Sequence, residues 1–151
     1  MPAPLAPNES ASALALLIRQ VRDNMWARMA RELADAGHEL TFSQYITLKK
    51  IATGTVGATE LARAADLNPG AMTRLIDKLV ARGLVTRVVD PRDRRALQID
   101  LTDLGRTIWS EIDQCGRRVR VRAMTGMSEE EQRQLTRLLE QIRDNLSFPG
   151  E

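Results

Sequence analysis

The sequence predicts a mostly helical α+β protein with the element order α-α-α-α-β-β-α-α. Apolar residues recur every three or four positions over most of the chain, which is the period of amphipathic helices. Two segments, 84–89 and 96–101, are instead β-branched or alternate apolar with polar residues, as strands do. The chain has 151 residues, of which 43% are apolar, and a net charge of +2, which together exclude an intrinsically disordered chain.

The N-terminal part is expected to be a tail followed by two helices. Residues 1–9 are proline-rich and are expected to be a flexible tail. A long helix is expected over residues 10–40, with an apolar stripe that begins at Leu14 and a stop near Gly37. Thr41 and Gln44 have the spacing of a capping box, which predicts a second helix from Phe42 to about Ala52.

Two shorter helices and a hairpin are expected next. Gly57 has the spacing of an N-cap for a short helix, and Asn68-Pro69 is the N-cap and first-turn proline of another helix that ends at Gly83. The polar segment Asp90 to Arg95 joins the two strands as a long hairpin loop.

Two helices are expected to complete the chain. Thr102 opens a long helix that Gly126 ends. Ser128 and Glu131 form a second capping pair for a last helix, which ends before Pro149.

Positive charge is concentrated in one segment of the chain. Residues 67–95 contain seven basic and three acidic residues, a net charge of +4, whereas the rest of the chain sums to −2. A short helix, a tight turn, a second helix and a hairpin with a basic tip form the pattern of a winged helix-turn-helix. Thr73 and Arg74 could hydrogen-bond to base edges, and Pro69 and Ala71 suit contacts with thymine methyl groups.

The sequence resembles the MarR family of bacterial winged-helix repressors from about Ser10 to Leu146. The most specific match is the segment 90–96, Asp-Pro-Arg-Asp-Arg-Arg-Ala, followed by 101–105, Leu-Thr-Asp-Leu-Gly. The segments 60–62 and 72–79 resemble the DNA-reading helix pair of that family. At Pro69, Gly70 and Ala71 this chain departs from commonly polar residues, which shifts the expected readout toward DNA shape and methyl contacts.

The resemblance implies a homodimer that binds double-stranded DNA. It divides the chain into a dimerisation helix at 10–40, a winged helix-turn-helix domain at 41–103 and C-terminal dimerisation helices at 104–148. It places recognition helix 68–82 in the major groove, and Arg95, oriented by Asp93, in the minor groove. The expected DNA-binding residues are Asn68, Pro69, Gly70, Ala71, Thr73, Arg74, Lys78, Arg92, Asp93, Arg94 and Arg95. The expected dimer-interface residues are Leu14, Ile18, Val21, Leu135, Leu139, Ile142 and Leu146.

Regulation by a small phenolic or aromatic effector is also implied by the resemblance. Trp26, His38 and Tyr45 lie on or next to the first two helices and are candidate ligand residues, although a surface imidazole at a helix end is the alternative for His38. Cys115 lies on an apolar stripe, which predicts a packing residue and not a redox sensor. The arginine run from 117 to 122 is expected to be a solvated face.

The composition argues against an enzyme, a metal site or a cofactor. One histidine and one cysteine leave too few groups for a histidine-dependent triad or a four-ligand zinc site, and no phosphate-binding loop motif is present. The longest apolar run, 13–18, is too short to span a bilayer and follows no basic segment. A cytoplasmic, nucleoid-associated, ligand-responsive repressor with a pseudo-palindromic operator is therefore the leading interpretation. A winged-helix module for protein contacts or non-specific DNA coating is the alternative, and a carboxylate enzyme is a more distant one.

Overall fold

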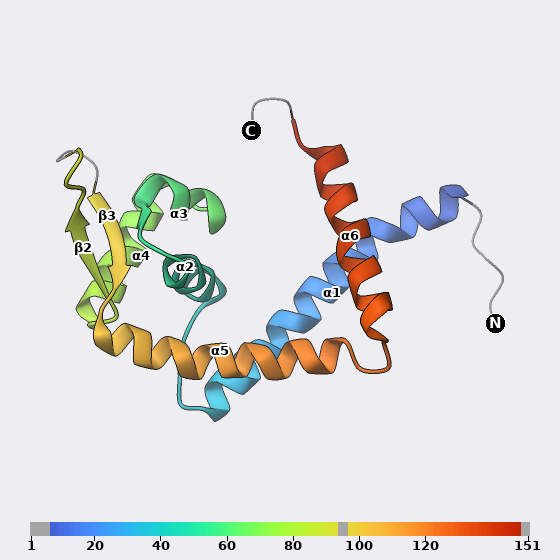
Figure 1. Ribbon diagram of the computed structural model, residues 1–151, viewed down its shortest axis with the longest axis horizontal. Coiled ribbons are helices and arrows are strands. Elements are labelled where there is room, and N and C mark those ends of the chain that lie inside the picture. The colour runs from blue at the N-terminus through green and yellow to red at the C-terminus, as the bar shows by residue number, and fades with distance from the viewer. Residues whose placement is uncertain (1–6, 94–96, 149–151) are drawn as a thin grey trace.

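The computed structural model describes residues 7–93 and 97–148 and contains six helices and a small sheet in that part of the chain. The elements, in order, are α1 (Pro7–Asp35), α2 (Phe42–Ala52), β1 (Val56–Gly57), α3 (Ala58–Ala64), α4 (Pro69–Ala81), β2 (Val85–Val89), β3 (Leu97–Leu101), α5 (Asp103–Ala123) and α6 (Glu129–Leu146). Figure 1 shows α2, α3, α4 and the hairpin gathered at one end of the molecule, with α6 and the start of α1 at the other and α5 running between them. The predicted fold class is confirmed, and α1 begins ahead of the boundary that the sequence predicts at residue 10.

Five helices begin at the N-cap residues that the sequence predicts, and all of these residues except Gly57 cap their helix with a side chain. The side chains of Thr41, Asn68, Thr102 and Ser128 each accept a hydrogen bond from a backbone N–H of the first helical turn. At Thr41 and Ser128 the capping box is complete, because Gln44 and Glu131 accept a hydrogen bond from the N-cap backbone in return. Each such cap is worth about 1 kcal/mol, so the helix starts are set locally by sequence.

The sheet has three antiparallel strands in the order β1-β3-β2, one strand more than the sequence predicts. Val85 pairs with Leu101 and Val89 with Leu97 in the β2–β3 hairpin, while β1 pairs with β3 through Val56 and Ile99. The element order is therefore α-α-β-α-α-β-β-α-α. A two-residue strand shows no alternation of apolar and polar residues, and only its pairing partner defines it.

The hydrophobic core lies at the end of the molecule that holds the hairpin. Leu61, Leu79 and Ile112 are completely buried there, from α3, α4 and α5. The C-terminal half of α1 joins this core through Met29 and Leu33. By contrast, α6 buries none of its residues against the rest of the chain. The isolated chain therefore leaves one helix without a packing partner.

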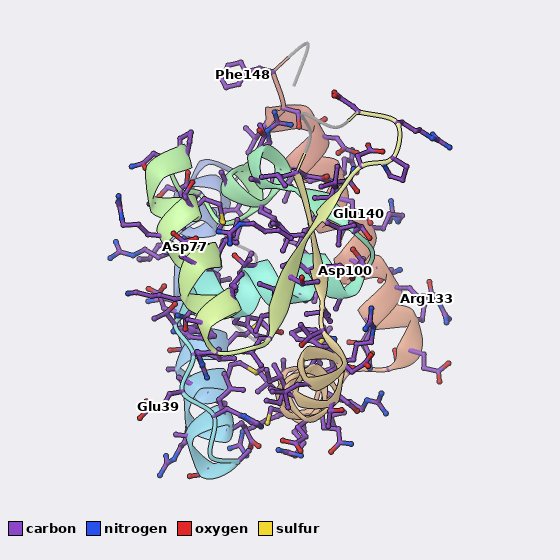
Figure 2. All side chains as sticks on the ribbon, turned by 90° about the vertical axis from the view of Figure 1, so that its left-hand side faces the viewer. Glu39, Asp77, Asp100, Arg133, Glu140 and Phe148 are labelled. Atoms are coloured by element: carbon purple, nitrogen blue, oxygen red, sulfur yellow. The ribbon has the colours of Figure 1, made fainter. Side chains whose placement is uncertain are left out.

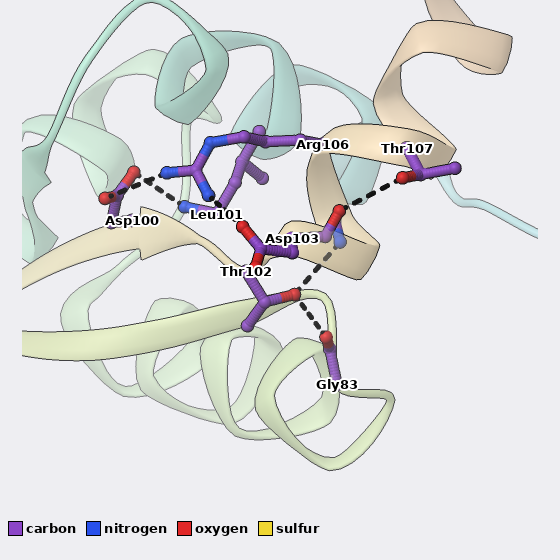
Figure 3. Close-up of polar contacts among 8 residues, drawn as sticks. Gly83, Asp100, Leu101, Thr102, Asp103, Arg106 and Thr107 are labelled. Atoms are coloured by element: carbon purple, nitrogen blue, oxygen red, sulfur yellow. Dashed lines mark hydrogen bonds and ion pairs between the residues drawn. The ribbon is translucent and has the colours of Figure 1, made fainter.

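A tight joint connects the hairpin to α5 at Thr102 (Figure 3). The Thr102 hydroxyl donates to the carbonyl oxygen of Gly83 at 2.5 Å and accepts from the backbone N–H of Gly105 at 2.9 Å. The Thr102 N–H donates to the carbonyl oxygen of Leu84 at 3.0 Å. Arg106 adds ion pairs to Asp100 at 3.4 Å and to Asp103 at 3.2 Å. The end of β3, the turn after α4 and the start of α5 are therefore fixed to one another.

Candidate nucleic-acid interface

Helix α4 has one buried and one exposed face. Its buried residues are Met72, Leu75, Ile76 and Leu79. Its exposed face carries five of the six α4 residues predicted to contact DNA, namely Pro69, Gly70, Thr73, Arg74 and Lys78. Asn68 is also exposed, and its carboxamide oxygen accepts a hydrogen bond from the N–H of Ala71 at 2.8 Å. The predicted recognition residues thus form a single surface at the start of α4.

The turn between α3 and α4 depends on an aspartate in a left-handed conformation. Asp66 has a φ of 53°, a region that aspartate tolerates better than most non-glycine residues. The N–H of Leu67 donates to the carbonyl oxygen of Ala62 at 2.9 Å, which closes the turn. This turn sets the angle at which α4 leaves α3, and Asp66 belongs to none of the sequence motifs that predict the helices.

Thr73, which is predicted to hydrogen-bond to base edges, already has a hydrogen-bond partner within α4. Its hydroxyl donates to the carbonyl oxygen of Pro69 at 2.9 Å, within α4. This proton is therefore engaged within the helix, and the oxygen can serve a base edge only as an acceptor.

Two aspartates fix the hairpin. Asp77 holds it to α4, and Asp90 forms hydrogen bonds within the hairpin. Arg87 of β2 forms an ion pair with Asp77 of α4, and Figure 2 shows α4, marked by Asp77, beside the hairpin that contains Asp100. The carboxylate of Asp90 accepts from the backbone N–H of Arg92 at 2.8 Å and from the side chain of Gln98 at 3.4 Å. Arg94 and Arg95, and with them the predicted pairing of Asp93 with Arg95, lie outside the described residues.

Trp26 and Tyr45, two of the three predicted ligand residues, line one cavity of about 240 Å³ between α1, α2 and α5. Their ring centroids are 5.8 Å apart, and the Phe42 ring lies 5.1 Å from Trp26. The cavity is also lined by three cationic side chains, Arg22, Lys49 and Arg120. Burial raises the pKa of the Tyr45 phenol, and nearby Arg120 partly opposes this. The combination of aromatic walls and cations suits a small aromatic anion.

His38 lies outside this cavity and is not the surface imidazole that the sequence suggests. Its side chain is 12% exposed, and its Nε2 lies 2.8 Å from a carboxylate oxygen of Glu111 on α5. The prediction of an exposed helix-end histidine is wrong because its partner is 73 positions away in the sequence, beyond the reach of local patterns.

Cys115 is a buried packing residue, as predicted. It is 1% exposed, and its sulfur lies 3.3 Å from Arg118 Nη2 and 3.7 Å from the carbonyl oxygen of Glu32. Burial raises the pKa of the Cys115 thiol, an effect that the Arg118 guanidinium partly opposes. Arg118 and Arg120 are exposed, as predicted for the arginine run, although each forms an ion pair, with Glu32 and Asp113.

Alkylation of Cys115 by iodoacetamide at pH 8 is expected to be slow in the folded protein. A raised pKa lowers the thiolate fraction, and the sulfur must also be uncovered by local opening before it can react. We expect a rate at least about a hundredfold below that of the same protein in 8 M urea. Mass spectrometry of timed samples measures both rates, and equal rates would contradict the packing role.

Most residues predicted to form a dimer interface are exposed in the single chain. In α1 the exposed fractions are 37% for Leu14, 42% for Ile18 and 49% for Val21. In α6, Leu135, Leu139 and Leu146 are exposed and Ile142 is half-buried. Isolated exposed leucines are ordinary, whereas two helices that each carry a row of them indicate an unfilled interface.

Other kinds of site are not seen in the described part of the chain. Among residues 7–93 and 97–148, no group of three or more His, Cys, Asp or Glu side chains could hold a metal ion. The helices in the same ranges include none with the length and apolarity needed to cross a membrane.

A two-helix unit with an exposed second helix, followed by a three-stranded sheet with a hairpin, defines a winged helix-turn-helix protein. The sequence model of the MarR family matches residues 40–97, which contain α2 to β2 and the start of β3. The chain belongs to the MarR family of winged helix-turn-helix transcriptional regulators. This confirms the family resemblance.

Known proteins similar to this chain include a curated regulator and several solved structures. The HTH-type transcriptional regulator TtmR of Methylorubrum extorquens (strain PA1) is 36% identical over 112 residues, 74% of this chain. The match spans just over half, 56%, of that relative's length. A mutant of MarR from E. coli, solved in complex with operator DNA, has a TM-score of 0.73 at 24% identity and covers 91% of this chain and 99% of its own. A MarR-family regulator from Silicibacter pomeroyi has a TM-score of 0.79 at 20% identity, covering 97% and 100%.

Proposed function

We propose that this protein is a sequence-specific DNA-binding repressor that acts as a ligand-responsive homodimer. Its operator is a pseudo-palindrome in which two copies of α4 enter successive major grooves, with half-sites about 10 base pairs apart. The hairpin contacts the flanking DNA, with Arg95 as the minor-groove residue that the family resemblance implies. A regulator of this kind acts on the nucleoid, in the cytoplasm.

The observation that carries this proposal is the exposed face of α4. Five of the predicted DNA-contacting residues lie there, and the buried face of the same helix anchors it in the core. The structure of E. coli MarR with operator DNA supports the proposal because it has this fold. Apolar residues exposed on α1 and α6 support the dimer, since they offer a surface for a second copy.

Arg74→Ala and Lys78→Ala are expected to affect DNA binding differently. A guanidinium that reads a base contributes about 1 to 3 kcal/mol of discrimination, so Arg74→Ala lowers the ratio of specific to non-specific affinity roughly tenfold. Lys78 lies one turn further along α4, where a phosphate contact is expected, so Lys78→Ala weakens binding to all sequences alike. Fluorescence anisotropy at fixed salt, with a selected and a scrambled duplex, measures both ratios.

A specificity ratio near one for the unmodified protein would favour the alternative, a module that coats DNA without sequence preference. If Arg74→Ala lowers the affinity for both duplexes equally, Arg74 contacts phosphate and not a base. Circular dichroism of both variants shows whether a loss of binding reflects unfolding.

We further propose that the cavity at Trp26 and Tyr45 binds a small aromatic anion that releases the protein from DNA. Salicylate is a suitable probe because it combines an aromatic ring with a carboxylate. Titration with salicylate is expected to quench tryptophan fluorescence, because Trp26 forms a wall of the cavity. Arg120→Ala is expected to weaken salicylate binding about tenfold, since it removes one of the cations that line the cavity.

The control variant for this titration is Arg137→Ala, which removes an exposed arginine from α6, far from the cavity along the chain. The neutral analogue salicylamide distinguishes attraction by charge from simple apolar binding, and it is expected to bind more weakly than salicylate. Equal binding of salicylate to Arg120→Ala and to the unmodified protein would exclude Arg120 from the site.

A further inference from the structure

The N-terminal half of α4 presents a single guanidinium on a mostly apolar surface. Arg74 is exposed, and within residues 7–93 and 97–148 no hydrogen bond or ion pair engages its side chain. This distinguishes it from Arg87 and Arg82, which bind Asp77 and the carbonyl oxygen of Glu39. The N–H groups of Arg74 are therefore available to a ligand that presents acceptors to α4.

Two polar groups near Arg74 already have partners inside the helix. The hydroxyl of Thr73 donates to the carbonyl oxygen of Pro69, and the carboxamide oxygen of Asn68 accepts from the N–H of Ala71. The surface around Arg74 also has apolar groups, namely the ring of Pro69, the Cα of Gly70 and the methyl groups of Ala71 and Thr73. Together they form what we call the apolar collar of Arg74.

Gly70 leaves a gap in the apolar collar. A Cβ built on Gly70 would lie 3.6 Å from Arg74 Nη1 and 3.5 Å from the Asn68 carboxamide oxygen. The Arg74 side chain thus extends back along the helix, over the position where another residue would carry a side chain. Glycine lowers helix stability relative to alanine, and its φ here is not in the left-handed region, so the backbone conformation does not require it. A Cβ here would make ordinary contacts, so the fold does not require glycine, and its absence leaves room for one methyl-sized group beside the Arg74 guanidinium.

We infer that α4 reads a thymine followed by guanine on one strand of each half-site, and that Gly70 determines this specificity. The inference rests on the proposed function. Guanine offers O6 and N7 as paired acceptors for one guanidinium, and the preceding thymine offers a methyl group in the same groove. Arg74 forms the bidentate contact with guanine, and the thymine methyl group occupies the gap at Gly70 against the apolar collar.

Base analogues test each half of this readout on the full-length protein. The bound sequences are first selected from a pool of randomised duplexes at fixed salt, and each half-site is expected to contain a thymine–guanine step. Replacing that thymine by deoxyuridine removes only the methyl group and is expected to weaken binding about fourfold. Replacing the guanine by 7-deazaguanine removes one acceptor and is expected to weaken binding about tenfold.

Two variants link these effects to α4. Gly70→Gln fills the gap, so the affinities for thymine and deoxyuridine duplexes are expected to become equal. Arg74→Lys keeps the charge but not the two-pronged geometry, so the penalty for 7-deazaguanine is expected to disappear while binding to scrambled duplex is kept. The matched control is Ala34→Gln, which adds the same side chain at an exposed position of α1 and leaves both penalties unchanged.

The outcomes separate this inference from the proposed function. A pool that yields no enriched sequence overturns the proposed function itself. Enriched sequences without a thymine–guanine step, or analogues that leave the affinity unchanged, overturn the readout while sequence-specific binding stands. Analogue penalties that persist in Gly70→Gln would assign the specificity to other residues of α4.

Discussion

Gly105→Ala is expected to lower the free energy of unfolding by about 4 kcal/mol, an exceptional loss for the addition of one methyl group. A Cβ at this position would lie 2.0 Å from the carbonyl oxygen of Leu84 and 3.3 Å from the hydroxyl oxygen of Thr102. The first of these atoms belongs to the backbone, so no side-chain rotation can relieve the overlap. The start of α5 must move away from the turn after α4, which breaks the hydrogen bonds made by Thr102.

Gly70→Ala is the matched control, since it adds the same methyl group to the first turn of another helix. There the new Cβ meets its neighbours at ordinary contact distances, 3.5 and 3.6 Å. Stability is therefore expected to stay level or to rise by up to about 1 kcal/mol. Urea unfolding followed by circular dichroism measures both variants. A Gly105→Ala variant as stable as Gly70→Ala would show that the contact between α5 and Leu84 is easily relaxed.

Leu139→Glu is expected to yield a folded monomer that binds the operator at least about a hundredfold more weakly. Leu139 is 44% exposed in the single chain, and α6 buries no residue in its own chain, so the substitution harms only an interface with another copy. A carboxylate in an apolar dimer interface loses its hydration without gaining a partner. The monomer then binds one half-site and forfeits the gain in affinity from linking two sites.

Light scattering at micromolar concentration measures the oligomeric state, and fluorescence anisotropy measures the affinity for the operator. Arg137→Gln is the control, because it changes the net charge by the same amount at an exposed position of α6. It is expected to remain dimeric and to bind DNA. A dimeric Leu139→Glu protein would show that the dimer interface lies elsewhere. A monomer with full affinity would show that operator binding does not require dimerisation.

Local sequence signals predicted the helix starts and the hairpin because their causes are local. The caps at Thr41, Asn68, Thr102 and Ser128 satisfy backbone groups within three residues of themselves, so a four-residue motif suffices to identify them. The strand β1 was missed because it exists only through its pairing with β3, about 40 residues later. The same reason applies to Gly105. This position must be glycine because a Cβ would overlap the carbonyl oxygen of Leu84, which lies on the other side of the hairpin in the sequence.

The candidate nucleic-acid interface and the cavity at Trp26 and Tyr45 were also predictable only in part from the sequence. Helical periodicity placed the α4 residues that are predicted to contact DNA on one surface, whereas the engagement of the Thr73 hydroxyl with Pro69 required the structure. Trp26 and Tyr45 share a cavity, but His38 is paired with Glu111, and no spacing rule distinguishes the three. Residue type alone suggested all three as ligand residues, and only the packing of α1 and α2 against α5 separated them.

The rigid joint at Thr102 makes α5 a lever. Its 21 residues extend about 30 Å from the hairpin toward α6. A tilt of about 5° at one end therefore displaces the other end by about 3 Å, close to the rise of one base pair. The cavity of Trp26 and Tyr45 reaches α5 at Gly116 and Arg120, well along this arm. In the ligand-responsive homodimer that we propose, a small ligand that shifts α5 there is expected to change the distance between the two recognition helices by about 3 Å.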